Sequence, residues 1–158
     1  PGIRTVLGLD IGPAMLFVAR QQLDGWGVSV AEAFEQALDN VRTQVAARKQ
    51  FALIHERIAD VPTLAFQSRD GWASSLLLLP EELTHVFGQR SGLILAPMRD
   101  LVICLPLDVE REFAQWLLDE FAAVDMNALD LPPFALVDGH LQHAVGVPPA
   151  LRRTAVPN

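Results

Sequence analysis

The stretch from Gly71 to Leu107 constrains the fold more than any other part of the chain, because it holds three short apolar runs. The runs cover residues 72–79, 92–98 and 101–107, and polar connectors separate them. Each run is rich in leucine or β-branched residues and is bounded by Gly, Pro or Asp, which favours buried strands over one long helix. We therefore expect these runs to form the central sheet.

Two hairpins are predicted in this sheet. The first joins residues 63–67 to residues 72–79 through Ser68-Arg-Asp-Gly71, whose aspartate and glycine are typical of a turn. The second joins the two later apolar runs through the connector Met98-Arg-Asp100. The two connectors thus share an Arg-Asp pair, thirty positions apart (69 to 99).

Amphipathic helices flank the sheet in the sequence and are its expected cover. Ser29 and Glu32 have the spacing of a capping box, and apolar residues at helical spacing continue from there to about Ala47. A second helix is predicted to begin at Pro80 and to stop at Gly88.

A third helix is predicted after Asp108, which we expect to be its N-cap. Its expected buried stripe consists of Val109, Phe113, Leu117, Phe121 and Val124, widened by Trp116. Residues 131–137 follow and contain two adjacent prolines, so they are predicted to form at best an edge strand.

The expected architecture is a single α+β domain over residues 1–145, followed by a tail with prolines and arginines over residues 146–158. A chain of 158 residues needs only one core. We predict a mainly antiparallel sheet of roughly four to six strands covered by two or three helices. The hydrophobic fraction of 51% excludes disorder of the body and indicates a thick core or an apolar interface.

Charge and hydropathy exclude several classes of partner. A net charge of -7 and a pI near 4.9 oppose the basic surface that nucleic-acid binding requires. The apolar runs are shorter than the roughly 20 residues that span a bilayer, so no membrane span is expected. The single Cys104 suits a reducing compartment, and we expect a cytoplasmic protein without a cofactor.

Residues 138–143 hold the most suggestive metal-ligating pattern of the sequence. Asp138, His140 and His143 have a spacing that supplies three zinc ligands if the segment is a helical turn. The alternative interpretation is a polar loop after the last strand, and no H-E-x-x-H pattern provides a general base.

Nucleophilic and nucleotide-binding sites find little support in the sequence. Ser74 and Ser75 lie in a predicted strand and lack the G-x-S-x-G turn that exposes a nucleophile. Cys104 lies in an apolar run, where burial raises the pKa of a thiol and makes it unreactive. No glycine-rich phosphate loop is present.

The Arg-Asp connectors are the candidate ligand or partner site. A guanidinium binds a carboxylate in a two-pronged fashion, so Arg69 and Arg99 are candidates to hold an acidic ligand or partner. The alternative is structural: Asp70 and Asp100 pair with these arginines as ordinary surface ion pairs in turns.

Three short motifs stand out along the chain: Trp26-Gly-Val-Ser29 followed by Ala33, Ala37 and Asn40, then Leu76-Leu-Leu-Leu-Pro80, and Pro97-Met-Arg-Asp100 followed by residues 101–105. Together they resemble the uncharacterised bacterial family typified by YtpQ. The resemblance covers roughly residues 14–138 and implies an α+β fold. It implies no activity, because the family has no assigned chemistry.

These observations lead to a hypothesis and two alternatives. The hypothesis is a non-enzymatic, cytoplasmic binding or assembly module, in which an apolar surface engages another protein or a second copy of the chain. One alternative is a metal-assisted hydrolase that uses Asp138, His140 and His143. The other is a small acidic chaperone of the secretion type.

Overall fold

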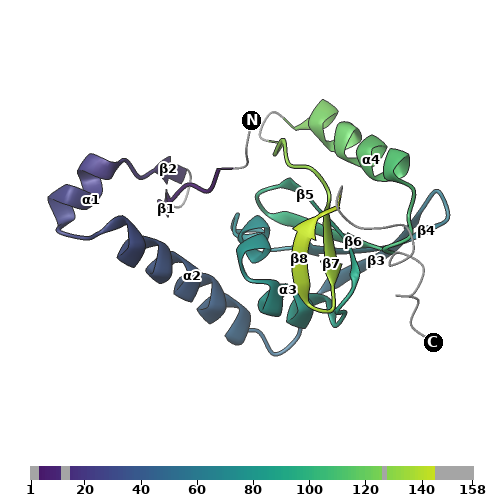
Figure 1. Ribbon diagram of the computed structural model, residues 1–158, viewed down its shortest axis with the longest axis horizontal. Helices are drawn as coiled ribbons and strands as arrows, with labels where there is room; N and C mark the ends of the chain where they lie inside the picture. The colour runs from purple at the N-terminus through teal and green to yellow at the C-terminus, as the bar shows by residue number, and fades with distance from the viewer. Residues whose placement is uncertain (1–3, 12–14, 126–127, 145–158) are drawn as a thin grey trace. The chain divides into compact units, whose positions relative to one another are not determined.

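The computed structural model describes residues 4–11, 15–125 and 128–144, which contain helices, a six-stranded sheet and a two-stranded sheet (Figure 1). Every strand pair is antiparallel, and the predicted α+β class is confirmed. The chain divides into two compact units, residues 1–47 and residues 48–158. The predicted tail lies outside the described residues.

The first unit contains a short hairpin and two helices. Strands β1 (Gly8–Asp10) and β2 (Met15–Phe17) pair antiparallel, and they are followed by α1 (Arg20–Trp26) and α2 (Val30–Ala46). Helix α1 ends at Gly27, whose φ of 69° is the left-handed conformation that glycine adopts without strain.

The predicted capping box begins α2. The amide of Glu32 donates to Ser29 Oγ at 3.2 Å, and the amide of Ser29 donates to Glu32 Oε2 at 2.9 Å. Hydrogen bonding to Ser29, through its side chain first and its backbone second, lowers the pKa of the Glu32 carboxyl. The helix ends at Ala46, within one residue of the predicted end near Ala47.

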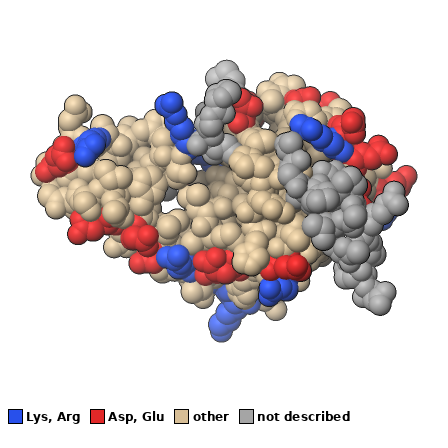
Figure 2. Space-filling view, in the orientation of Figure 1, with Lys and Arg blue, Asp and Glu red and all other residues tan. Residues whose placement is uncertain are grey.

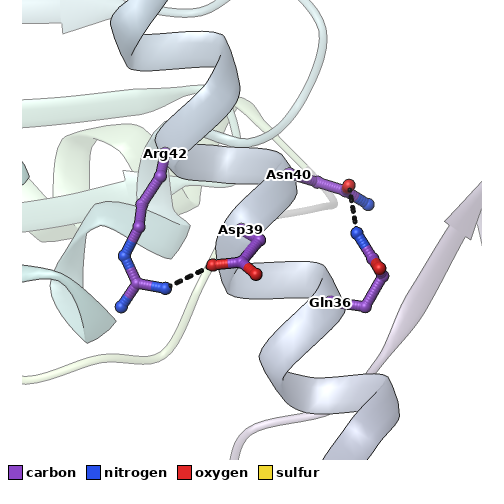
Figure 3. Close-up of polar contacts among 4 residues, drawn as sticks. All are labelled: Gln36, Asp39, Asn40 and Arg42. Carbon is purple, nitrogen blue, oxygen red and sulfur yellow. Dashed lines mark hydrogen bonds and ion pairs between the residues drawn. The ribbon is translucent and has the colours of Figure 1, made fainter.

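Helix α2 also carries side-chain pairs on its exposed face (Figure 3). Arg42 donates to Asp39 at 2.8 Å, and Gln36 donates to Asn40 at 3.1 Å. These pairs at three- and four-residue spacing each stabilise a helix by a few tenths of a kcal/mol.

The second unit is built on the six-stranded sheet, with strand order β3-β4-β6-β5-β7-β8. The strands are β3 (Leu53–Ile58), β4 (Val61–Gln67), β5 (Gly92–Met98), β6 (Leu101–Leu105), β7 (Phe134–Val137) and β8 (His140–His143). The prediction that residues 131–137 form an edge strand is wrong, because β8 pairs with β7 and takes the edge. The predicted hairpin across Arg99-Asp100 is confirmed as β5–β6.

Both faces of the sheet are covered, by different helices (Figure 1). Helix α4 (Arg111–Val124) covers one face, and a single hydrophobic cluster joins it to the strands. Its buried members are Ala65, Leu93, Leu95, Leu101, Ile103, Leu105, Leu107, Ala114, Leu117, Leu118, Ala135 and Ala144. Helix α3 (Pro80–Phe87) and the 3₁₀ helix η1 (Ala73–Leu78) lie against the other face, beside Phe66, Val102 and Ile94.

The predicted strand at residues 72–79 is wrong, because this segment forms η1. Ala73, Leu76 and Leu79 are buried and lie three residues apart, which matches the 3.0 residues per turn of a 3₁₀ helix. The predicted hairpin from residues 63–67 is therefore absent, and β4 pairs with β3 and β6. The helix predicted from Pro80 to Gly88 is confirmed as α3.

Two expectations for α4 need correction. Its N-cap is Glu110 without a side-chain hydrogen bond, because a turn from Pro106 to Val109 separates Asp108 from the helix. Val124 is 81% exposed and Trp116 is 44% exposed, whereas Ala114, Leu117 and Leu118 are buried. Leu117 is buried as predicted, and Val109, Phe113 and Phe121 are partly buried against the same cluster, so the predicted stripe is confirmed except at Val124 and Trp116.

Candidate functional site: the Arg-Asp corner

The two Arg-Asp connectors lie side by side in the fold. The amide of Ser68 donates to the carbonyl of Asp100 at 2.9 Å, and the amide of Ser74 donates to the carbonyl of Arg99 at the same distance. Gln67 Nε2 also donates to Asp100 Oδ2 at 3.1 Å. We call residues 67–72 and 99–100, together with Arg48, the Arg-Asp corner.

Strand pairing explains why these distant segments meet. Strands β4 and β6 are antiparallel, and Gln67 at the end of β4 lies opposite Leu101 at the start of β6. The residues that follow β4 therefore lie next to the residues that precede β6. Hairpin β5–β6 places its turn, Arg99-Asp100, at this same end of the sheet.

Ser68 organises the turn after β4. Its Oγ accepts hydrogen bonds at 3.2 Å from the amides of both Trp72 and Ala73, which lie at the start of η1. These amides have no partner within the first helical turn, so the buried Ser68 performs the role of a helix cap. Its hydroxyl is thereby committed to the backbone.

The turn contains two residues in the left-handed region. Gly71 has a φ of 79°, which its lack of a Cβ permits, and Arg69 has a φ of 64°. For a residue with a Cβ this conformation costs roughly 1–2 kcal/mol. The Arg69 side chain is exposed, and it makes no ion pair or hydrogen bond within the described residues. The cost is therefore not offset by a contact of that side chain in the described structure.

Two further guanidinium groups lie against the same turn. Arg48 stacks on Trp72, with its guanidinium carbon 4.8 Å from the ring centroid, and its Nη2 lies 3.7 Å from Asp70 Oδ2. The guanidinium of Arg99 lies 3.6 Å from the position that a Cβ on Gly71 would take. Three cationic side chains and two carboxylates thus gather here, which gives a local excess of one positive charge on an acidic protein.

Trp72 adds a buried indole N–H group to the corner. Its Nε1 is buried and has no hydrogen-bond acceptor among the described residues. Its ring contacts Phe66 at a centroid distance of 5.4 Å, and Phe66 in turn contacts Phe51. The corner therefore combines aromatic rings with guanidinium groups, and the guanidinium groups are suited to binding an anionic oxygen.

The structure does not gather the predicted metal ligands. Asp138 and Gly139 form the turn of hairpin β7–β8, with φ values of 51° and 84° that are typical of a type I′ turn. His140 and His143 lie on β8, so the predicted helical turn is wrong. Their spacing of three places the imidazoles on opposite faces of the sheet, and His143 contacts the ring of Phe134. No cluster of three or more His, Cys, Asp or Glu suited to a metal occurs within the described ranges.

Cys104 is buried as predicted. It is 2% exposed, and desolvation by burial raises the pKa of its thiol to about 12. Ser74 and Ser75, predicted to lie in a strand without a nucleophile turn, lie on η1 instead and not on a strand-to-helix elbow. None of these three residues is placed for nucleophilic catalysis.

A second candidate surface lies on the first unit and was not located from the sequence. Seven of the eleven large hydrophobic side chains found exposed among the described residues belong to residues 1–47. They are Val6, Leu9, Ile11, Leu16, Phe17, Trp26 and Val30. Figure 2 shows one face of this unit, on which Asp and Glu lie along a border and the remaining surface is largely uncharged. The signal in the sequence is the lack of charged side chains between Ile11 and Ala19.

Comparisons with family models, with curated proteins and with solved structures give no match to this chain. The likeness to the YtpQ family thus stays an expectation. Among the described residues, no helix combines the length and apolarity needed to cross a membrane.

Proposed function

We propose that the chain is a non-enzymatic binding or assembly module that engages another protein, or a second copy of itself, through the apolar surface of its first unit. The observation that carries the proposal is the exposed hairpin β1–β2. Phe17 is 74% exposed and Leu16 is 50% exposed, on strands of three residues each. A cytoplasmic location and membership of the YtpQ family are part of the same proposal.

The hairpin has apolar side chains on both faces. Leu9 lies directly opposite Leu16, so these two side chains share one face, whereas Phe17 lies opposite Gly8 on the other face. A two-stranded hairpin is marginally stable in water by itself, because it buries too little apolar surface. Contact with a partner would cover Leu9 and Leu16 together and would stabilise the hairpin.

The β3 edge of the large sheet is a poorer surface for a second copy. Two copies can pair their β3 strands antiparallel about a twofold axis perpendicular to the sheet. Each side chain then stays on the same face of the sheet as its partner, so the two residues of a pair are an even number of positions apart in the sequence. A pair centred on Glu56 sets two carboxylates opposite each other. A pair centred on His55 sets Ile54 opposite Glu56, which combines an apolar residue with a charge.

Sedimentation equilibrium of the full chain tests the proposal in its self-association form. We expect Phe17→Ser to weaken association by at least about tenfold, or about 1.4 kcal/mol. Val124→Ser is the matched control, because Val124 is 81% exposed but lies on α4 of the second unit. Equal association of wild type and Phe17→Ser would contradict this self-association form of the proposal, as would a wild-type chain that stays monomeric up to about 1 mM.

A further inference from the structure

We propose that Arg69 in the Arg-Asp corner is a binding residue for a carboxylate carried by an acidic segment of a partner protein. This inference rests on the proposed function, because it assumes a binding module, but it concerns a different surface from the β1–β2 hairpin. The first observation that supports it is that the three arginines of the corner differ in their contacts.

Arg99 and Arg48 have structural contacts in the corner, whereas Arg69 does not. The guanidinium of Arg99 lies next to Gly71, and the carbonyl of Arg99 accepts a hydrogen bond from the amide of Ser74. Arg48 stacks on Trp72. Arg69 is exposed and has no ion pair within the described residues, although it occupies a conformation that favours glycine. Because the Arg69 guanidinium is exposed and has no internal partner among the described residues, its hydrogen-bond donors are accessible to an external group.

The chemistry of the corner selects an anionic oxygen ligand. The planar guanidinium of Arg69 can donate two parallel hydrogen bonds to a carboxylate. The neighbouring carboxylates do not occupy it: Asp100 accepts from Gln67, and Asp70 lies 3.7 Å from Arg48. Because Arg48 and Arg99 lie against residues 70–72, their charges add to the attraction for an incoming anion.

An acidic segment fits better than a small free anion. The corner is an open turn at the end of a sheet, and Arg69 and Asp70 are exposed, so one anion would remain largely hydrated there. A chain with several carboxylates can contact Arg69 while its neighbours approach Arg48 and Arg99, and binding several groups together raises the effective concentration of each.

Trp72 provides the reporter for the test, since its ring touches Arg48. Trp26 and Trp116 are both more than 40% exposed, so Trp26→Phe with Trp116→Phe leaves Trp72 as the single tryptophan of a folded chain. In this background we titrate a capped hexaglutamate peptide at low salt and follow the Trp72 fluorescence. The expected result is saturable binding that a capped hexaglutamine peptide does not show.

Four variants test the role of Arg69. Arg69→Glu should weaken peptide binding by at least tenfold, whereas Arg111→Glu, an equal change of charge at an exposed arginine on α4, should leave it nearly unchanged. Arg69→Gly should keep or raise the melting temperature, since glycine accepts the positive φ, and should still lose binding. Phe17→Ser should retain peptide binding, so failure of the hairpin proposal and failure of this one are distinguishable.

The following results would overturn the inference. The first is the absence of saturable peptide binding to the wild-type corner. The second is an equal loss of binding in Arg69→Glu and Arg111→Glu, which would indicate non-specific attraction. The third is displacement of the peptide by inorganic phosphate at the same molar concentration, which would indicate a general anion site and not one for acidic segments.

Discussion

The guanidinium of Arg48 lies 4.8 Å from the centroid of the Trp72 ring, at the end of a row of aromatic contacts. The row runs from Trp72 to Phe66, then to Phe51, and ends at His85 on α3. It connects the Arg-Asp corner to the core beneath it, so the corner is held by packing as well as by hydrogen bonds.

We therefore expect Arg48→Ala to lower the free energy of unfolding by about 1 kcal/mol, the magnitude of a partly exposed cation-π contact with a weak ion pair. Urea denaturation monitored by tryptophan fluorescence measures the change. Arg42→Ala is the control, because Arg42 makes only an i,i+3 pair on α2, and its effect should not exceed about 0.5 kcal/mol. Equal losses in the two variants would show that the contact with Trp72 contributes nothing specific.

Arg99 has a structural role, so Arg99→Ala should cost about 0–1 kcal/mol and leave association unchanged. The turn keeps its hydrogen bonds, since Ser74 and Ser68 bind the carbonyls of Arg99 and Asp100 and not the Arg99 side chain. The melting temperature and the sedimentation-derived association constant are both needed. A loss of association of more than tenfold at constant melting temperature would assign Arg99 to recognition instead.

Gly92 and Cys104 are in close contact across strands β5 and β6. A Cβ on Gly92 would lie 2.6 Å from Cys104 Sγ, so Gly92→Ala should destabilise the fold by about 1–3 kcal/mol. Cys104→Ala removes the sulfur, and the double variant should therefore lose less than the sum of the single losses. Gly25→Ala on α1 is the control, because nothing lies within 4 Å of its Cβ position, and it should not destabilise the chain. Strict additivity of the two losses would contradict this account.

Cys104 also predicts a pH dependence at alkaline pH. Burial raises the pKa of the thiol from 9.0 to about 12, so the folded state retains a proton that the unfolded state loses. The contribution is fully present below pH 9.0 and is lost as the pH rises toward 12. Relative to Cys104→Ala, the wild type should lose up to about 1.4 kcal/mol per pH unit in this window. Identical pH profiles of the two chains, from denaturant unfolding, would refute the burial of this thiol.

Elements with local signals were predictable from the sequence. Ser29 and Glu32 mark the start of α2 through their spacing alone, and Pro80 with Gly88 marks both ends of α3. The β5–β6 hairpin was predictable because its two apolar runs are separated only by Arg99-Asp100. In each case the residues that determine the element lie within a few positions of one another.

Elements decided by longer-range packing were missed. The run at residues 72–79 is apolar enough for a strand, yet leucine is not β-branched, and the buried positions recur every three residues. For residues 140–143 the histidine spacing predicts a helical turn or a loop, although the Asp138-Gly139 dipeptide before them is typical of a hairpin.

From the sequence, the Arg-Asp corner could be predicted only as two separate Arg-Asp pairs, at residues 69–70 and 99–100. Their meeting depends on the pairing of β4 with β6, which are far apart in the sequence, and Arg48 enters the site from outside either connector. The apolar hairpin was also missed, because exposure of Leu16 and Phe17 is a property of the folded chain and not of its composition.

The most direct test of the proposed assembly function is amide hydrogen exchange of β1 and β2, measured at about 1 µM and about 1 mM chain. If the hairpin is the contact surface, its amides should gain protection at the higher concentration, while amides near the exposed Val124 of α4 should not. Unchanged exchange in the hairpin of a chain that self-associates, or protection that appears at α4 instead, would contradict the account.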